Sequence, residues 1–498
     1  MPTGWTSAWR AKETSTNSER ILGADGIVPV TAKLLFSNRE TRVLEGSAAG
    51  SLPPHALMQR AGLALARFAL AAAPHAQIIW IPCGPGNNGG DGYEAAKHLK
   101  QWGKHPIVTS LVSTTPLPAD AAAARQGAVN AGVAFADRVP DAYDLCIDAL
   151  FGIGSLRNFE EPYATWIDRI NAKQAPVIAV DVPSGLDAET GTASALHVKA
   201  DFTLSLLTLK PGLFTAAGRD ACGEIWFNSL DIPEPATACA QLNTLPIPAT
   251  RAHNTHKGTY GDVGVIGGAC GMTGAALLAA KAALHGGAGR IYVGLLDPEP
   301  LQLDPCQPEL MFRAPTALAY ESMSVVAGCG GGPSIRAYLP DILDRSARLI
   351  LDADALNIIA EDTSLQNRLV LRKGRPTILT PHPLEAARLM GLSSAEVQAN
   401  RLKAAQSLAD QFACAVVLKG SGTVIAAPNT RPRINPTGNA RLATAGTGDV
   451  LAGLIGAGLA AGGDAFQAAC TAVFRHGQVA DRWTVATTLT AQRLAQAL

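Results

Sequence analysis

Short apolar segments that lead into loops of small and polar residues recur along this chain of 498 residues. The clearest segment, residues 77–83 (Q-I-I-W-I-P-C), runs into residues 84–92 (G-P-G-N-N-G-G-D-G). A helical segment, residues 93–102, follows. A strand, a glycine loop and a helix in this order are typical of a parallel sheet that offers its carboxyl edge to a phosphate-bearing ligand. The pattern predicts an α/β fold.

Two further apolar segments of the first half end at an aspartate beside a flexible loop. Residues 144–150 (D-L-C-I-D-A-L) contain Asp148, and residues 175–182 (A-P-V-I-A-V-D-V) contain Asp181. Because the carboxyl ends of parallel strands line one crevice, we expect Asp91, Asp148 and Asp181 to meet there. One such aspartate is more often a cap or turn residue, but three on successive loops indicate a site.

A cation site is expected at the same edge of the sheet. The oxygens of Asn88, Asp148 and Ser184 would suit a hard cation, because oxygen ligands select alkali and alkaline-earth ions. A plain turn is the alternative for residues 84–92, since Asn-Gly and Asp-Gly pairs are common turn formers. Five glycines, two asparagines and an aspartate in nine residues favour a functional loop.

The second half repeats the arrangement after a glycine turn and an Ala-rich helix that ends near His285. Its apolar segments are expected to be strands, and polar or glycine-rich loops follow them. These loops are residues 328–332, 352–357, 380–385 and 419–423. The second half is therefore predicted to be another α/β domain with its loops at one edge.

The stretch G-T-G-D at residues 446–449 precedes an apolar helical run. Its small residues let backbone N–H groups converge on a phosphate at a helix N-terminus. Asp449 would lie beside the phosphoryl group and could accept the proton of an attacking hydroxyl. An N-cap aspartate after a glycine turn is the alternative. His382 and Lys419 could each be surface residues, but together with this anion hole they indicate an ATP site without a P-loop motif.

Composition limits the classes of function. The chain has 41 basic and 41 acidic residues, so neither a nucleic-acid nor a membrane-surface partner is indicated. The nine cysteines form no C-x-x-C pair, which argues against zinc and disulfides and favours a reducing cytoplasm. The most apolar stretch, residues 450–463, is shorter than a membrane span, and no secretory signal is expected at the start.

The length predicts two to three domains. Residues 1–30 are polar and aperiodic and are expected to be a disordered extension. A proline-rich segment predicts a linker at residues 239–250, between domains at residues 31–238 and 251–498.

The first-half motifs G-P-G-N-N-G-G-D-G, D-A-L-F-G-I-G and V-D-V-P-S-G-L-D resemble the NAD(P)H-hydrate epimerase domain of the bifunctional NAD(P)H-hydrate repair enzymes. The resemblance implies a Rossmann-like three-layer domain with a potassium ion held by Asn88, Asp148 and Ser184. It makes Asp181 the candidate for proton handling. It places the substrate on Asn87, Asn88, Gly89, Gly90, Asp91, Gly152, Ile153, Gly154, Ser155, Leu156, Arg157, Asn158 and Asp181.

The second-half motifs K-G-T-Y-G, G-G-A-C-G-M-T-G-A, D-A-D-A-L-N, T-P-H-P-L-E, L-K-G-S-G-T and G-T-G-D-V-L-A-G resemble the ribokinase-like ADP- or ATP-dependent NAD(P)H-hydrate dehydratases. The resemblance implies that Asp449 is catalytic. It places the hydrated nicotinamide nucleotide on Ala275, Gly332, His382 and Asp449. It places the adenine nucleotide on Lys419, Gly420, Ser421, Gly422, Thr423 and Gly448.

Together the resemblances imply an enzyme that interconverts the R and S epimers of hydrated NADH or NADPH and dehydrates the S epimer with ADP or ATP and magnesium. We expect nucleotides as its small-molecule partners, a homo-oligomer, and no nucleic-acid or membrane partner. A ribokinase-type kinase of a small alcohol fused to a nucleotide-binding regulatory domain is the alternative. The first half could also be a binding module without catalytic activity.

Overall fold

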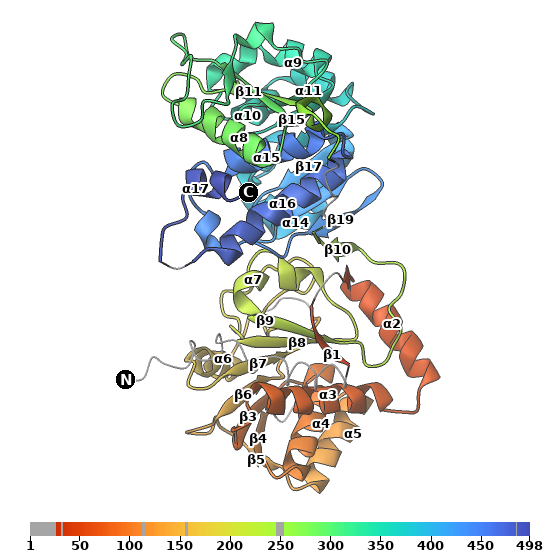
Figure 1. Cartoon of the computed structure of the whole chain (residues 1–498). Helices are drawn as coiled ribbons and strands as arrows, with labels where there is room; N and C mark the ends of the chain where they lie inside the picture. The colour runs from red at the N-terminus through yellow and green to blue at the C-terminus, as the bar shows by residue number, and fades with distance from the viewer. Residues whose placement is uncertain (1–25, 31–32, 112–115, 155–157, 246–252, 485) are drawn as a thin grey trace. The chain divides into compact units, whose positions relative to one another are not determined.

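The computed structural model describes residues 26–30, 33–111, 116–154, 158–245, 253–484 and 486–498. The chain forms two compact units, residues 1–239 and 240–498 (Figure 1). The division falls at the start of the segment for which a linker was expected. Part of that segment is a strand, β10 (Ala240–Leu242), which pairs in parallel with β19 (Thr430–Ile434) of the second unit.

The first unit is built on a mainly parallel sheet with the strand order β1-β9-β8-β7-β6-β3-β4-β5. Only the pairing of β1 with β9 is antiparallel among these strands. The strands are β1 (Ile27–Pro29), β3 (Ile78–Cys83), β4 (His105–Ser110), β5 (Ala134–Ala136), β6 (Leu145–Asp148), β7 (Val177–Val180), β8 (Phe202–Leu206) and β9 (Glu224–Asn228); β2 (Leu34–Leu35) is separate from this sheet.

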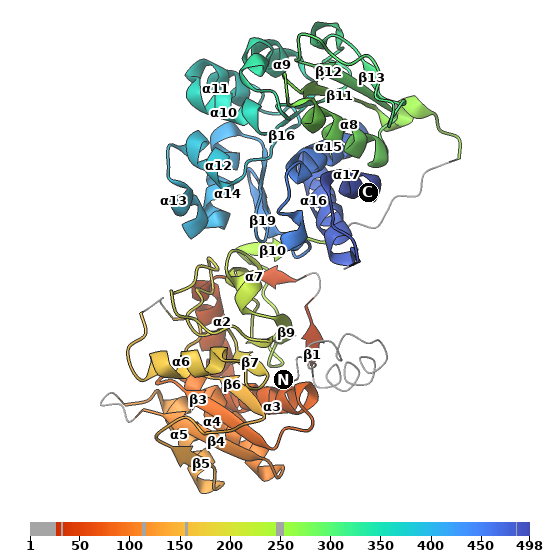
Figure 2. The same cartoon turned by 90° about the vertical axis from the view of Figure 1, so that its left-hand side faces the viewer.

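Helices cover both faces of this sheet, as the alternating direction of strand side chains requires. Ile79 and Ile81 of β3 pack in one hydrophobic core with α3, α4 and α5, whereas Trp80 packs with α6 on the other side. Figure 2 shows the three layers. The helices are α2 (Asn38–Ser51), α3 (Ala56–Ala72), α4 (Asn87–Gln101), α5 (Ala119–Asn130), α6 (Tyr163–Asn171), η2 (Pro211–Phe214) and α7 (Gly218–Ala221).

Two expectations for the first unit were wrong in part. The helix after β3 was expected from residue 93, but α4 begins at Asn87, so the asparagines and Asp91 belong to the helix. A disordered extension was expected to residue 30, but β1 pairs with β9 and Ile27 is fully buried. The rest of that extension, residues 1–25, lies outside the described residues.

The second unit has a sheet with the strand order β13-β12-β11-β14-β15-β16-β17-β18-β19-β10. The pairs β17-β18 and β18-β19 are antiparallel, and the others are parallel. The strands not yet given are β11 (Asp262–Gly267), β12 (Arg290–Leu295), β13 (Met311–Phe312), β14 (Ser324–Ala327), β15 (Arg348–Leu351), β16 (Thr377–Leu379), β17 (Ala415–Leu418) and β18 (Val424–Ala427).

The Ala- and Gly-rich helices α8 and α15 pack closely on this sheet. A Cβ atom at Gly453 of α15 would lie 1.9 Å from the carbonyl oxygen of Ala279 in α8, so only glycine fits. The helices are η3 (Lys257–Tyr260), α8 (Thr273–His285), η4 (Pro315–Ala317), η5 (Pro333–Ala337), α9 (Leu339–Arg345), α10 (Asp354–Glu361), α11 (Thr363–Val370), α12 (Pro383–Met390), α13 (Ser394–Ala399), α14 (Arg401–Phe412), η6 (Ala440–Leu442), α15 (Thr447–Ala460), α16 (Ala465–Arg482) and α17 (Ala491–Gln496). Within the described ranges, no helix has the length and apolar character that crossing a membrane requires.

Candidate active sites

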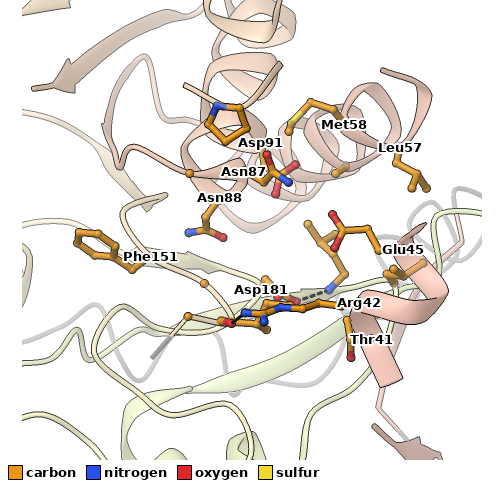
Figure 3. Close-up of a pocket in the computed structure, with 18 of the residues that line it drawn as sticks. Thr41, Arg42, Glu45, Leu57, Met58, Asn87, Asn88, Asp91, Phe151 and Asp181 are labelled. Atoms are coloured by element: carbon orange, nitrogen blue, oxygen red, sulfur yellow. Dashed lines mark hydrogen bonds between the residues drawn. The ribbon is translucent and has the colours of Figure 1, made fainter. Parts of the chain in front are cut away.

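A pocket of about 490 Å³ opens at the carboxyl edge of the first unit's sheet (Figure 3). Its walls come from α2, the start of α3, the first turns of α4, and the loops after β6, β7 and β8. The parallel strands therefore bring distant parts of the sequence to one cavity, as expected for this class of sheet. The polar side chains that line it include Arg42, Glu45, Asn87, Asn88, Asp91, Asp120, Asp181 and Lys210.

Asp181 directly follows β7 and has a left-handed backbone with φ of 65°. Its Oδ1 atom forms an ion pair with the fully buried ammonium group of Lys210 and accepts a hydrogen bond of 3.0 Å from the N–H of Leu206. Lys210 also donates 2.9 Å to the carbonyl oxygen of Leu206. These contacts fix one carboxylate oxygen of Asp181. A strained conformation held this firmly is typical of functional positions.

Two more carboxyl groups lie beside this ion pair. Burial, and then the charge of Asp181, raise the pKa of Glu45, against a hydrogen bond from the Asn87 side chain. Burial, and then the charges of Asp181 and Glu45, raise the pKa of Asp91 well above its usual value. The pocket thus combines acidic groups in different environments, an arrangement that separates general acids from general bases.

Asp148, the last residue of β6, is completely buried. Its carboxylate accepts hydrogen bonds of 2.7 Å from the Ser184 hydroxyl and 2.8 Å from the Ser184 N–H. Burial raises the pKa of Asp148 to about 6, against these hydrogen bonds and one from the N–H of Leu150. Asp148 is absent from the residues that line the pocket, so the expected meeting of Asp91, Asp148 and Asp181 was only partly correct.

Asn88 completes the group of oxygen donors expected for a cation. Its Nδ2 atom is buried without a hydrogen-bond partner among the described residues. Its Oδ1 atom lies 3.0 Å from where a Cβ atom of Gly152 would be. Because amide oxygen and nitrogen positions are interchangeable by rotation, the unpartnered end of Asn88 could equally be an oxygen ligand. The donors Asn88, Asp148 and Ser184 therefore fit a cation that prefers oxygen.

The predicted substrate residues of the first unit fall into three groups. Asn87, Asn88, Asp91, Gly152, Ile153, Gly154 and Asp181 line the pocket. Gly89, Gly90 and Asn158 are not among its lining residues. Gly89 and Gly90 instead permit close packing, since their Cβ atoms would lie 2.1 Å from the Gly84 oxygen and 2.6 Å from Met58. Ser155, Leu156 and Arg157 lie outside the described residues.

The sequence interpretation did not include several polar residues of this pocket, among them Arg42, Glu45, Asp120 and Lys210. Glu45 and Arg42 lie on α2, a helix that carries no recognisable motif, and the Arg42 guanidinium donates 3.1 Å to the carbonyl oxygen of Ile153. Lys210 follows β8, whose apolar pattern ends in a strand-end loop like the others. A search for charged residues at every strand end would have found Lys210 but not Glu45.

In the second unit, Asp449 lies in the first turn of α15, after Gly446 with its left-handed φ of 89°. Burial, and then the charge of Asp352, raise the pKa of Asp449 to about 7, against a hydrogen bond from the Cys329 thiol and the charge of Lys419. Metal-ligating atoms of Cys329, Asp352 and Asp449 lie within 4.8 Å of one another. A carboxyl group with this pKa can exchange a proton near neutral pH.

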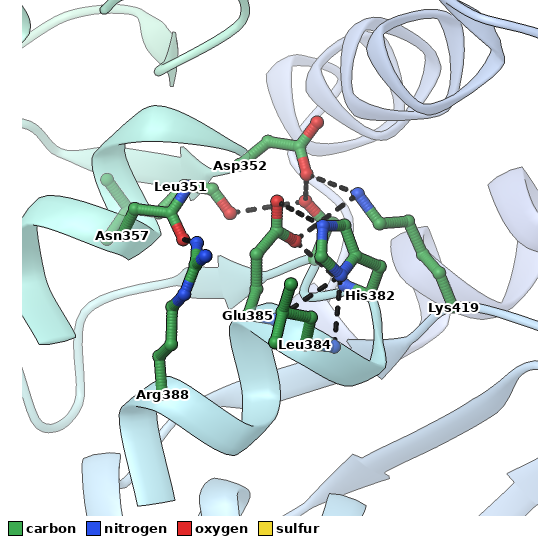
Figure 4. Close-up of polar contacts among 9 residues, drawn as sticks. Leu351, Asp352, Asn357, His382, Leu384, Glu385, Arg388 and Lys419 are labelled. Atoms are coloured by element: carbon green, nitrogen blue, oxygen red, sulfur yellow. Dashed lines mark hydrogen bonds and ion pairs between the residues drawn. The ribbon is translucent and has the colours of Figure 1, made fainter. Parts of the chain in front are cut away.

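Lys419, at the end of β17, is held between two acidic side chains (Figure 4). Its ammonium group lies 2.6 Å from the Asp352 carboxylate and 3.9 Å from that of Glu385. Burial lowers the pKa of Lys419, but the charges of Asp352 and Glu385 outweigh burial and raise it. The Thr380 hydroxyl donates 2.8 Å to Asp352. Lys419 therefore remains a positive charge close to Asp449.

His382 serves as the N-cap of α12. Its Nδ1 atom accepts hydrogen bonds from the N–H groups of Leu384 (3.1 Å) and Glu385 (3.3 Å), and its Nε2 atom lies 3.2 Å from the Glu385 carboxylate. Burial, and then the charge of Lys419, lower the pKa of His382. Both ring nitrogens already have partners, so a ligand could contact the half-exposed ring through its face or its C–H edge.

The other predicted residues surround this centre. A Cβ atom at Gly448 would lie 3.5 Å from the Lys419 ammonium nitrogen, so the anion hole and the lysine are adjacent. The N–H of Gly332 donates 2.8 Å to Asp354. A Cβ atom at Gly330 would lie 2.9 Å from the Cβ of Ala275. Ala275 thus lies against the glycine loop after β14.

Arg401, a buried residue that the sequence interpretation missed, supports the start of the loop at residues 419–423. Its guanidinium donates 3.1–3.2 Å to the carbonyl oxygens of Leu418 and Lys419. Gly420 has φ of 132°, and a Cβ atom there would lie 3.0 Å from Arg401. Cys329 was missed also, because a lone cysteine carries no spacing signal.

Comparisons with known proteins match both units. The family described as NAD(P)H-hydrate dehydratase matches residues 263–498, and the one described as YjeF-related protein N-terminus matches residues 54–212. The bifunctional NAD(P)H-hydrate repair enzyme of Escherichia coli (strain K12) is 36% identical over 444 residues, which cover 85% of this chain and 84% of that protein. This chain belongs to the bifunctional NAD(P)H-hydrate repair enzymes.

Relatives of the second unit alone are also similar. The ADP-dependent (S)-NAD(P)H-hydrate dehydratase of Neisseria meningitidis serogroup B is 42% identical over 240 residues, 46% of this chain and 80% of that protein. The ADP/ATP-dependent NAD(P)H-hydrate dehydratase of Bacillus subtilis, co-crystallised with ATP/Mg2+, is 31% identical, with a TM-score of 0.42, over 50% of this chain and 91% of that one. The family resemblance and the α/β fold class predicted from the motifs are confirmed.

Proposed function

We propose that the first unit interconverts the R and S epimers of hydrated NADH and NADPH, and that the second unit dehydrates the S epimer with ADP or ATP. The observation that carries this proposal is the match to a bifunctional repair enzyme across 85% of the chain. Each unit also has a centre of titratable groups at the carboxyl edge of its own sheet. The proposed domains are residues 31–238 and 251–498.

The dehydration begins at the hydroxyl group that hydration has added to the ring. Asp449 accepts the proton of this hydroxyl while the hydroxyl oxygen attacks the terminal phosphoryl group of the nucleotide. The bond from that phosphorus to the bridging oxygen breaks, and ATP leaves as ADP or ADP leaves as AMP. The C–O bond to phosphate then breaks, and the neighbouring carbon loses a proton, which restores the ring double bond. Phosphate leaves more readily than hydroxide, so phosphoryl transfer makes the elimination feasible.

The environment of Asp449 supports this role. Its pKa of about 7 lets the carboxylate form predominate just above neutral pH while keeping it basic enough to accept a proton. The Lys419 ammonium group beside it and the N–H groups at the start of α15 would stabilise the charge of the transferred phosphoryl group. Lys419 to Thr423 and Gly448 would hold the adenine nucleotide, with magnesium on its phosphates, and Ala275, Gly332 and His382 the hydrated nucleotide.

Potassium is the cation we propose for the first unit. Asn88, Asp148 and Ser184 supply neutral and anionic oxygens with one formal negative charge, which favours a large monovalent ion over magnesium with its strict octahedral geometry. A cation there would also compensate the buried carboxylate of Asp148, whose pKa burial raises to about 6. It would anchor the first turn of α4 against the loop that follows β7.

The test of the two activities uses purified protein and a mixture of both hydrate epimers. Without nucleotide, we expect the ratio of R to S to relax to its equilibrium value faster than in buffer. With ATP or ADP, both epimers should be converted to NADH, with one phosphate released for each molecule. A stable phosphorylated product without phosphate release would instead identify a small-molecule kinase.

The test of the cation compares epimer exchange in potassium and sodium buffers. Wild-type protein should be faster in potassium, and Asp148→Ala should exchange epimers slowly in both buffers while still dehydrating the S epimer. Asp137→Asn, a change at an exposed aspartate of the same unit, is the matched control. Equal wild-type rates in the two buffers would leave the potassium site without support.

A further inference from the structure

The charged groups of the first-unit pocket are arranged unequally around Asp181. The Oδ1 atom of Asp181 forms an ion pair with Lys210 and accepts a hydrogen bond from the N–H of Leu206. The Lys210 side chain has no exposed surface, so water does not reach the ion pair from the side of the lysine. Asp181 is therefore held in one orientation at the pocket, as a positioned base must be.

Epimerisation, however, requires a proton donor. Water adds across the ring double bond with its oxygen on the carbon attached to the ring nitrogen, because that nitrogen stabilises the positive charge. Inversion at this carbon can proceed when the hydroxyl group leaves as water and water returns to the other face. Hydroxide is a poor leaving group, so an acid must protonate the hydroxyl as its C–O bond breaks.

We propose that Glu45 is this general acid, acting opposite Asp181 as the base, an inference that rests on the proposed epimerase function of the same pocket. Glu45 projects from α2 into the pocket that Asp181 and Lys210 line (Figure 3). The Asn87 side chain, in the first turn of α4, lies close enough to Glu45 to lower its pKa. Because Glu45 lies on α2 and outside the glycine loops, the sequence interpretation did not include it.

The proton balance of the step is closed within the pocket. Glu45 gives its proton to the leaving hydroxyl, the C–O bond breaks, and the lone pair of the ring nitrogen forms a C=N bond. A water molecule then adds to the carbon from the opposite face, so the C=N bond becomes a single bond again, and the water gives one proton to Asp181. Proton exchange from Asp181 back to Glu45 through water restores both groups, so no proton is consumed and nothing is oxidised.

The surroundings of Glu45 favour the protonated form that an acid needs. Burial and the negative charge of Asp181 raise its pKa, and the positive charges of Lys210 and Arg42 oppose this effect. The charge of Glu45 in turn contributes to the raised pKa of Asp91. At the rim, Asp120 is paired with His55 at 2.5 Å.

Asp91 is the competing candidate for the acid. It lies on α4, and burial raises its pKa well above the usual value. Both side chains are partly exposed at the pocket, but Glu45 reaches it from α2 and lies beside the exposed Asn87 side chain. The variants described next decide between the two carboxyl groups.

The test measures epimer exchange against pH for wild type, Glu45→Gln, Glu45→Asp and Asp91→Asn. Glu234→Gln, a change at an exposed glutamate of the same unit, is the matched control. We expect Glu45→Gln to lower kcat by about 100-fold with little change in KM, because general acids contribute at least that much. The wild-type rate should fall at alkaline pH as Glu45 loses its proton, and Glu45→Gln should lack this fall. Glu45→Asp should restore part of the rate and the fall.

The outcomes separate this inference from the proposed function. Wild-type protein that does not accelerate epimer exchange overturns the epimerase function itself. Active wild-type protein, with a Glu45→Gln variant within threefold of it and with the same alkaline fall, overturns only the role of Glu45. Loss of the alkaline fall in Asp91→Asn instead would transfer the role to Asp91. A large rise in KM with unchanged kcat would show that Glu45 only binds substrate.

Discussion

Replacing Asp449 by asparagine should stabilise the second unit while it abolishes dehydration. The ionised carboxylate of Asp449 is unfavourable in the folded protein, because burial and the charge of Asp352 raise its pKa from 3.8 to about 7. A difference of this size corresponds to at most about 4 kcal/mol at a pH above both values. Partial exposure to solvent and relaxation of nearby charges reduce the expected gain to about 1–2 kcal/mol.

The sign of the pH dependence follows from proton linkage. Between about pH 4 and pH 7 the folded protein binds more protons at Asp449 than the unfolded chain, so wild-type stability falls as the pH rises through this range. The asparagine of the variant cannot titrate, so the variant lacks this loss. The difference between variant and wild type should therefore be small at pH 4 and should reach its full size above pH 7. Glu385 and Cys329 are present in both proteins, so their contributions to the pH dependence of stability largely cancel in this difference.

Differential scanning calorimetry at pH 4 and pH 8 measures this effect. For a unit of this size, a gain of 1–2 kcal/mol corresponds to a rise in Tm of about 2–8 °C at pH 8. Asp410→Asn, a change at an exposed aspartate of α14, should leave Tm unchanged at both pH values. An unchanged or lower Tm for Asp449→Asn at pH 8, or an equal rise at both pH values, would refute the reasoning. Epimer exchange should remain at the wild-type rate.

Substitutions at three further positions test contacts in both units. Cys329→Ala removes the thiol hydrogen bond that lowers the pKa of Asp449, so the acid limb of the dehydration rate should move to higher pH, whereas Cys329→Ser should keep the wild-type profile. Gly420→Ala places a methyl group 3.0 Å from Arg401 at φ of 132°, so KM for ATP should rise several-fold while epimer exchange is unaffected; an unchanged KM would contradict the role of this loop. Asp181→Asn should stop epimer exchange, and a simultaneous loss of dehydration of pure S epimer would contradict the assignment of the two activities to separate sites.

Much of the fold followed from local sequence patterns. Strands buried on both faces of a parallel sheet must be short, continuous apolar runs, and the glycines and polar residues after them mark their ends. This explains why β14 (Ser324–Ala327) and β16 (Thr377–Leu379) end directly before the loops predicted at residues 328–332 and 380–385. The sequence also predicted that Lys419, after β17, lies near Asp449, in the first turn of α15, and the charge of Lys419 does act on Asp449.

Contacts between distant residues could not be predicted in this way. Asp181 raises the pKa of Glu45 only because α2 brings Glu45 into the pocket at the carboxyl edge of the sheet, and no local pattern encodes that position. The packing roles of Gly89 and Gly90 also depend on what faces them, so the sequence could not distinguish packing from ligand binding there. His382 caps α12 in a position where serine or aspartate is usual, and the sequence did not predict this role.

Because α4 begins at Asn87, residues 87–90 are already ordered in the folded protein, and their conformational entropy is lost before a ligand binds. The first N–H groups of a helix have no partners within it, and here they already point in fixed directions before any ligand arrives. The conformational entropy of residues 87–90 is therefore lost during folding, not during substrate binding. A nucleotide that docks against this helix start would bind a surface that is already formed, so its association should be fast and show little of the ordering entropy that accompanies the closing of a flexible glycine loop.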